Sequence, residues 1–287
     1  MKIFTIGGSG MVGSRITELL SDKHSFDDLS LTSGVDITNP QSLDVIKKDI
    51  EHEVVILLAA KADVDGCETD KRSGEDGTAW KINVGGVKHV VDACLNTNKK
   101  LIYISTDFVF DGENTPEGGY REEDKPNPIN WYAETKYRGE EVVRNSGLPF
   151  IIARIAYPYR KEFELKKDFV RAIVSRLKSN QTVAAITDHV MTPTFIDDIA
   201  FALDKLIETD SKGIFHVTGS QSLTPYDAAI LIAEKFNLDK SLITKTTREE
   251  YFKGKAPRPF NVSMNNDRIK NLGVKIKSFE EGLVSLL

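Results

Sequence analysis

Cysteine is scarce in this chain, and long apolar runs are missing. The 287 residues include two cysteines, Cys67 and Cys94, which lie far apart and form no Cys-x-x-Cys pair. This spacing argues against a disulfide framework and against a zinc site. The apolar stretch Ile3–Ile6 is too short for the core of a signal peptide or for a membrane span. We therefore expect a cytoplasmic protein with no metal site.

A surplus of positive charge is also missing. Lys and Arg number 38 against 43 Asp and Glu, which gives a net charge of −5, and the basic residues are dispersed along the chain. Nucleic acids and anionic membranes require a concentrated basic surface, so neither is expected as a partner. Apolar residues make up 40% and charged residues 28%, which is ordinary for a folded globular protein. We expect the partner to be a small molecule. The sequence does not decide whether the protein forms a homo-oligomer.

Short, almost continuously apolar runs alternate with segments of helical periodicity in the first half of the chain. Because buried parallel strands are apolar on both faces, this β-α-β-α pattern predicts an α/β fold with a Rossmann-type doubly wound parallel sheet. The predicted strands are Ile3–Ile6, Leu29–Thr32, Val54–Leu58, Leu101–Ser105 and Phe150–Arg154. The predicted helices between them include Val12–Leu20, Leu43–Ile50 and Trp80–Val91.

The regular alternation ends after Arg154, which predicts a change of domain. Residues 1–156 are predicted to form an NAD(P)-binding Rossmann domain, and residues 157–287 mainly a smaller C-terminal α/β substrate-binding lobe. A segment near 188–219, with a predicted strand at Ile214–Val217, is expected to return to the first domain. Thr224 and Pro225 have the residue types that cap and open a helix.

A glycine-rich turn follows the first predicted strand. Gly7-Gly8-Ser9-Gly10-Met11-Val12-Gly13 fits Gly-x-Gly-x-x-Gly from Gly8 and Gly-x-x-Gly-x-x-Gly from Gly7. Side chains at these glycines would block the tight turn, the approach of a pyrophosphate to backbone N–H groups, or the packing of helix on strand. The N-terminus of the following helix attracts the anion. The context of strand, turn and amphipathic helix predicts dinucleotide binding.

The residues after the second predicted strand bear on the choice of cofactor. An acid commonly binds the adenosine ribose there when NAD is preferred, whereas this chain has Thr32, Ser33 and Gly34. Two small hydroxyls leave room for a 2′-phosphate, which favours NADP(H) over NAD(H). Arg15 either reaches that phosphate or is an exposed helix charge. Asp36 could instead serve NAD or contact the adenine.

Reduction of a carbonyl requires a hydride donor, a proton donor and a group that tunes the pKa of the proton donor. Tyr132 and Lys136 are spaced to share one helical face. The same Tyr-x-x-x-Lys spacing recurs at Tyr157/Lys161 and Tyr251/Lys255, so spacing alone does not select the catalytic pair. Tyr132 precedes the fifth predicted strand, and Thr106 ends the fourth at the sheet edge where ligands bind. We therefore predict Thr106, Tyr132 and Lys136 as catalytic.

Longer motifs around these residues resemble the extended short-chain dehydrogenase/reductases, and within them the dTDP-4-dehydrorhamnose reductase branch. The similarity covers most of the chain. Its motifs are Tyr103–Gly112, Pro126–Asn130, Tyr132–Lys136, Ala59-Ala60 with Val64-Asp65, Asp188-His189 with Thr192–Thr194, and Arg258-Pro259 with Ser263.

The resemblance implies hydride transfer from a nicotinamide to the 4-keto carbon of a nucleotide-linked sugar, with Tyr132 as proton donor. Thr106 would polarise the carbonyl, and Lys136 would hold the nicotinamide ribose and lower the pKa of Tyr132. Asp107, Tyr157 and Arg258, together with Thr106, are the residues expected to bind the nucleotide sugar. The residues expected to bind the cofactor are Gly7, Gly10, Met11, Val12, Gly13, Ser33, Asp36, Ile37, Ala59, Ala60, Lys61, Tyr132 and Lys136.

The sequence also departs from this branch close to the expected substrate. Lys61 and Ala62 replace an aromatic or His followed by Thr, Met191 replaces a small residue, and Tyr157 replaces a tryptophan. Which sugar and which nucleotide are used is therefore left open. One alternative is an epimerase-reductase of the GDP-fucose synthase kind, although Asp107 stands where that group has cysteine. Another is a non-catalytic dinucleotide-binding subunit, as in methionine adenosyltransferase, against which the Thr106, Tyr132 and Lys136 set argues.

Overall fold

A parallel β-sheet of six strands forms the centre of the protein in a computed structural model that describes residues 1–287. The strand order is β2-β1-β3-β4-β5-β9, so the chain leaves β1 toward one edge and returns to its other side at β3. This reversal is the topological switch point of a doubly wound sheet, as predicted. The strands are β1 (Lys2–Ile6), β2 (Ser25–Leu29), β3 (Val54–Leu57), β4 (Lys100–Thr106), β5 (Phe150–Ile155) and β9 (Gly213–His216).

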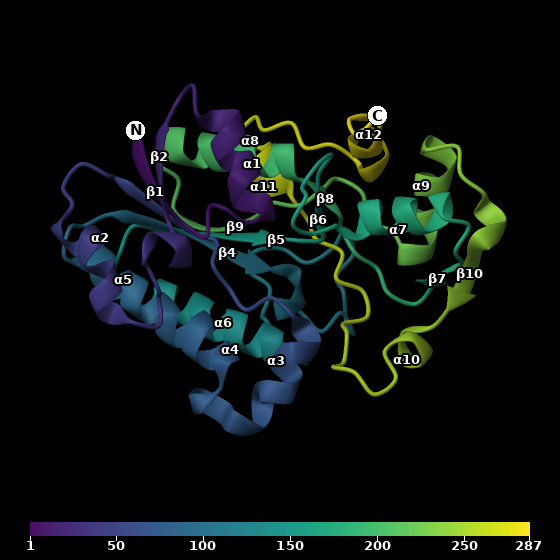
Figure 1. Ribbon diagram of the computed structural model, residues 1–287, viewed down its shortest axis with the longest axis horizontal. Coiled ribbons are helices and arrows are strands. Elements are labelled where there is room, and N and C mark those ends of the chain that lie inside the picture. The colour runs from purple at the N-terminus through teal and green to yellow at the C-terminus, as the bar shows by residue number, and fades with distance from the viewer.

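Helices cover both faces of this sheet (Figure 1). One apolar core joins the sheet to α1 (Met11–Leu20) and α8 (Ile196–Glu208). A second core lies on the other face, under α2 (Asp44–Lys48), α5 (Val87–Leu95) and α6 (Trp131–Arg144). The inner strands are therefore buried on both faces, which explains their almost continuously apolar sequences.

The second strand differs from its prediction. The structure places β2 at Ser25–Leu29, with the polar sequence SFDDL, and folds Leu31–Ser33 into a 3₁₀ turn closed by Ser30 and Ser33. As an edge strand, β2 pairs only with β1 and leaves most of its side chains exposed, so it needs few apolar residues. Leu31, which suggested a strand, is 76% exposed.

The rest of the chain builds a smaller assembly beside the carboxyl ends of the sheet (Figure 1). Its apolar cluster packs α7 and α9 with α12, and two pairs of short parallel strands complete it. Thr224 caps α9 and Pro225 occupies its first turn, as predicted. The elements are β6 (Pro158–Tyr159), α7 (Phe169–Lys178), β7 (Val183–Ile186), β8 (Thr194–Phe195), α9 (Pro225–Lys235), β10 (Ile243–Thr246), α10 (Arg248–Tyr251) and α12 (Phe279–Val284). The short helix α11 (Asp267–Lys270) instead packs beside β9, and its Ile269 joins the core under α1 and α8.

Between β3 and β4 the chain forms α3 (Val64–Asp70), a 3₁₀ segment (Lys71–Asp76), α4 (Thr78–Trp80) and a π-helical turn (Lys81–Gly86) that runs into α5. The π-turn contains Asn83, which is 1% exposed. Such turns widen a helix locally and often occur at functional sites. No helix in the structure has the length and apolar character needed to cross a membrane.

Candidate active site

The glycine turn joins β1 to α1 at the switch point of the sheet. Gly7 has φ +83°, and a Cβ there would lie 2.9 Å from the backbone nitrogen of Ala59, after β3. A Cβ on Gly13 would lie 2.7 Å from the Cα and carbonyl oxygen of Gly8. The amide of Gly8 donates to the Asp28 carboxylate at 2.7 Å, which fixes the turn to β2. The glycines therefore allow close backbone packing that any side chain would disrupt.

Replacing Gly13 with Ala is expected to weaken NADPH binding by at least about tenfold, because the new methyl group must displace the backbone of Gly8. The dissociation constant measured by nucleotide fluorescence checks this. Gly85→Ala is the matched control, since the nearest atom to a Cβ there is 4.0 Å away. Equal affinity of the two variants would contradict a close-packed binding turn.

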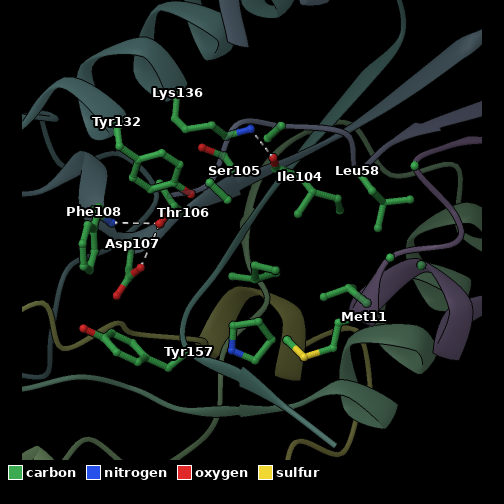
Figure 2. A pocket seen from close by; sticks show the side chains of 18 of the residues that line it. Met11, Leu58, Ile104, Ser105, Thr106, Asp107, Phe108, Tyr132, Lys136 and Tyr157 are labelled. Atoms are coloured by element: carbon green, nitrogen blue, oxygen red, sulfur yellow. Dashed lines mark hydrogen bonds between the residues drawn. The ribbon is translucent and has the colours of Figure 1, made fainter. Parts of the chain in front are cut away.

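A cavity of about 350 Å³ extends from the glycine turn to the carboxyl ends of β4 and β5. Thr106 enters it from the end of β4, and Tyr132 and Lys136 enter from successive turns of α6 (Figure 2). Asn130 begins α6 by accepting a hydrogen bond from the amide of Ala133 at 2.9 Å. The fold thus brings all three predicted catalytic side chains into one cavity.

Lys136 is held deep in this cavity. Its Nζ donates to the carbonyl oxygen of Ile104 at 2.8 Å and lies 4.0 Å from the centroid of the Tyr103 ring. Burial lowers the pKa of Lys136 to about 7, against an opposing effect of the Glu140 carboxylate. Charged and neutral forms are therefore both populated near neutral pH.

Tyr132 has its hydroxyl directed toward Thr106 (Figure 2). Burial raises the pKa of Tyr132 above its usual value, and the nearby Asp107 carboxyl adds to this rise. From the sequence, we expect Lys136 to lower the pKa of Tyr132. In this structure Lys136 is bound to Ile104 and burial dominates, so Tyr132 holds its proton at neutral pH.

Asp107 is the buried carboxyl of the cavity. Its Oδ1 accepts a hydrogen bond from the Thr106 hydroxyl at 3.0 Å, while its Oδ2 is buried without a protein partner. Burial raises the pKa of Asp107 to about 7. This carboxyl can therefore either donate or accept a hydrogen bond near neutral pH.

The raised pKa of Asp107 implies a dependence of stability on pH. The native carboxyl stays protonated up to about pH 7, whereas in the unfolded chain it ionises near pH 4. Between these values, raising the pH therefore lowers the free energy of unfolding. Asp107→Asn is therefore expected to be more stable than the wild type at pH 8, by roughly 1–4 kcal/mol at about 1.4 kcal/mol per pKa unit. Urea unfolding at pH 4 and pH 8 measures this; the same difference at both values would contradict it.

A second cavity lies on the other side of the glycine turn. It is lined by the turn, by Ala59 and Ala60 after β3, and by Asp36 and Ile37. Thr32, one of the two hydroxyls predicted to leave room for a 2′-phosphate, also lines it, as does Ser30, which the sequence did not single out. Its position beside Gly7 suits the adenosine half of a dinucleotide.

Two predicted cofactor residues do not line either cavity. Ser33 exchanges hydrogen bonds with the backbone of Ser30 at 2.8 and 3.0 Å, because the turn at Leu31–Ser33 replaces the predicted strand end. Lys61 stands between Ala60 and Ala62, which line the first cavity, but its own side chain is 3.8 Å from the carboxylate of Asp70. Arg15 forms a bidentate pair with Asp197 at 2.7 and 2.8 Å, so it is a structural charge between α1 and α8.

Sequence reasoning missed Asn83. Its amide accepts from the backbone nitrogen of Lys61 at 2.9 Å and donates to the carbonyl of Lys61 and to the Thr135 hydroxyl. It thereby ties the loop after β3 to the catalytic helix α6. No spacing signal pointed to this role, since it depends on the π-turn. Phe108 and Lys166 were also missed and line the first cavity.

Of the two residues Tyr157 and Arg258, the structure brings only Tyr157 to the first cavity. Tyr157 lines the first cavity with a backbone φ of +40°, which is strained for a bulky residue and typical of functional positions. Its hydroxyl is 2.9 Å from Nε2 of His189. Arg258 does not line this cavity; it pairs with the Asp65 carboxylate of α3 at 2.9 Å.

The other Tyr-x-x-x-Lys pairs do not resemble Tyr132 and Lys136. Lys161 donates to the carbonyl oxygen of Leu287 on the surface, although its partner Tyr157 lines the cavity. Tyr251 and Lys255 are both exposed near α10. Only the pair on α6 brings both of its side chains to the cavity.

Comparison with known proteins places this fold and site in a family. The model described as RmlD substrate binding domain matches residues 1–287. The dTDP-4-dehydrorhamnose reductase of Aggregatibacter actinomycetemcomitans is 28% identical, over 99% of this chain and 98% of that protein. Methionine adenosyltransferase 2 subunit beta of Bos taurus is 30% identical, over 84% of this chain and 71% of that protein.

Solved structures agree with this relationship. The crystal structure of dTDP-4-dehydrorhamnose reductase from Bacillus anthracis in complex with NADP has a TM-score of 0.89 and 27% identity, covering 99% of this chain and 98% of that one. The resemblance predicted from the motifs is thus confirmed. The chain belongs to the RmlD substrate binding domain family, within the extended short-chain dehydrogenase/reductases.

Proposed function

We propose that this protein is a dTDP-4-dehydrorhamnose reductase, which reduces the 4-keto group of a dTDP-linked deoxysugar with NADPH. The observation that carries the proposal is that Thr106, Tyr132 and Lys136 line a single cavity that continues to the glycine turn. Relatives that match nearly the whole chain bear this name. The cavity size lies within the range of small-molecule sites.

A nicotinamide dinucleotide fits the residues present. The close backbone packing of Gly7 and Gly13 leaves the turn open for a pyrophosphate, with one cavity on each side of it. NADP is favoured over NAD for two reasons. A relative binds NADP, and the hydroxyls of Ser30 and Thr32 line the adenosine cavity. Asp36 is its only carboxylate, and its Oδ1 already accepts from Thr38 at 2.9 and 2.8 Å.

When bound, the nicotinamide supplies a hydride to the carbonyl carbon. Tyr132 gives its proton to the carbonyl oxygen, and an alcohol results. The raised pKa of Tyr132 keeps that proton in place until negative charge develops on the substrate oxygen. The Thr106 hydroxyl, which donates to Asp107 in this structure, would polarise the same oxygen from the end of β4 by turning its hydrogen toward it.

Lys136 prepares the site for this proton transfer. Its ammonium group lies on the catalytic helix one turn beyond Tyr132 and would hold the ribose hydroxyls beside the nicotinamide. A positive charge on Lys136 favours the tyrosinate left behind, by an amount that falls as the distance between the two groups grows.

The substrate side of the cavity is formed by Asp107 and Tyr157, which we assign to the sugar. The Lys166 side chain lines the same cavity and offers a cation to the diphosphate of the nucleotide sugar. Arg258, paired with Asp65 outside the cavity, is assigned to its outer margin.

The test is consumption of NADPH by the purified protein in the presence of a panel of nucleotide-linked 4-keto-6-deoxy sugars. Turnover is expected with the dTDP-linked sugar, and NADH is expected to support it less well than NADPH. Turnover only with a GDP-linked sugar would instead favour an epimerase-reductase of the GDP-fucose synthase kind. A stable complex with a partner protein and no turnover would favour a regulatory subunit, as the relationship to methionine adenosyltransferase 2 subunit beta allows.

A further inference from the structure

The hydroxyl of Tyr157 is bound from behind by a buried histidine. Tyr157 Oη lies 2.9 Å from Nε2 of His189, and Nδ1 of His189 lies 2.8 Å from the carbonyl oxygen of Pro259. His189 is 2% exposed, so no solvent competes for its nitrogens. Backbone pairing of Val190 with Phe260 and Val262 holds the two segments together.

These contacts determine where each proton lies. The Pro259 carbonyl only accepts hydrogen bonds, so Nδ1 of His189 must carry a hydrogen. Burial lowers the pKa of His189 to about 4, and the imidazole is therefore neutral with an unprotonated Nε2. Nε2 then accepts the hydrogen of the Tyr157 hydroxyl. The Tyr157 oxygen is left with lone pairs only.

We propose that His189 is a positioning residue that fixes Tyr157 as a hydrogen-bond acceptor, so that the cavity selects a keto sugar with a free hydroxyl beside Tyr157. A sugar in which that hydroxyl is missing or alkylated leaves the acceptor unpaired. This inference rests on the proposed function and specifies its substrate.

The surroundings of Tyr157 support a role in substrate selection. The ring of Phe108 lies 6.2 Å from that of Tyr132 and 6.1 Å from that of Tyr157, so it neighbours both the proton donor and the acceptor. The hydroxyl of Tyr157 and the carboxyl of Asp107 point to the same side of the cavity (Figure 2). Since Asp107 can donate or accept, Tyr157 is the member of this pair with a fixed polarity.

The test compares a dTDP-linked 4-keto-6-deoxyhexose with its 2-deoxy and 3-deoxy counterparts. Dissociation constants are measured by calorimetry with oxidised NADP present, which prevents turnover. The wild type is expected to bind one deoxy counterpart roughly ten times more weakly than the parent sugar. In Tyr157→Phe and His189→Leu, the ratio of the dissociation constants of the deoxy and parent sugars should fall to about two or less. His189→Gln, whose amide can both accept from Tyr157 and donate to Pro259, should keep most of it.

Tyr251→Phe is the matched control, since this tyrosine is exposed outside the cavity and should leave the ratio unchanged. No preference in the wild type, or a full preference in His189→Leu, would overturn the inference. Nitrogen NMR of the wild type gives a test that needs no variant: the Nδ1–H form of His189 is expected, and the Nε2–H form would overturn the inference. If the sugars bind but NADPH is not consumed, the proposed function is refuted. The ratio of the dissociation constants then still tests the role of His189. No binding of any of the sugars would overturn both.

Discussion

Replacing Tyr132 with Phe is expected to lower kcat for the keto sugar by about a thousandfold, within the range usual for loss of a general acid. The variant keeps the aromatic ring in the cavity but has no proton for the carbonyl oxygen. Its hydroxyl forms no structural hydrogen bond required by the fold, so NADPH affinity and thermal stability should stay close to those of the wild type. Steady-state kinetics and nucleotide titration measure the two effects separately.

Tyr137→Phe is the control for this substitution. Tyr137 lies on the same helix, packs against a separate apolar cluster and does not line the cavity. Its replacement should leave kcat within about twofold of the wild type, as expected for a position outside the reacting groups. A Tyr132→Phe enzyme that keeps more than a tenth of the wild-type kcat would exclude Tyr132 as the main proton donor.

Replacing Glu140 with Ala is expected to lower the free energy of unfolding by about 3–5 kcal/mol. Glu140 lies on the catalytic helix one turn after Lys136, and it binds Arg154 of β5 through two hydrogen bonds of 2.9 and 2.7 Å. Their side chains are 0% and 1% exposed, so removing the carboxylate leaves a guanidinium buried with only His216 and the Phe110 ring nearby. Urea unfolding measures the loss.

The same helix supplies the control. Glu134 pairs with Arg138 at 2.8 Å on its exposed face, and Glu134→Ala should cost no more than about 0.5 kcal/mol. Replacing both buried partners, with Glu140→Leu and Arg154→Met, should recover much of the loss, since no unpaired charge is left. Equal costs for Glu140→Ala and Glu134→Ala would show that the buried pair does not hold α6 on the sheet.

Strongly apolar strands and glycines under steric constraint could be predicted from the sequence. The inner strands β1, β3, β4 and β5 agree with their predictions because they are buried on both faces, and burial demands a continuous apolar run. The edge strand β9 is only partly buried, and its apolar signal came from Ile214 and Phe215. The edge strand β2 has no such demand, and its polar sequence gave no signal. Of the two hydroxyls predicted to leave room for a 2′-phosphate, Thr32 lines the adenosine cavity and Ser33 does not, because Ser33 closes the 3₁₀ turn after β2.

The electrostatics of the site could not be predicted from spacing. The Tyr132/Lys136 spacing correctly put both side chains in one cavity, but it carries no information on burial, which sets both pKa values here. Contacts between segments that are far apart in the sequence could not be predicted from spacing either. His189 meets Tyr157 and Pro259 only because separate segments pair in the second lobe. Asn83 reaches Lys61 only because a π-turn rotates it inward. The domain boundary after residue 156 stays a prediction.

The most direct test of the central claim follows the hydride itself. The purified protein is incubated with dTDP-linked 4-keto-6-deoxyhexose and NADPH in which both hydrogens on the reactive carbon of the nicotinamide are deuterium, and the product is analysed by NMR. We predict that deuterium appears at C4 of the sugar, where the carbonyl carbon has become an alcohol carbon. A product with no deuterium at C4, or an unchanged sugar with NADPH bound, would contradict the account.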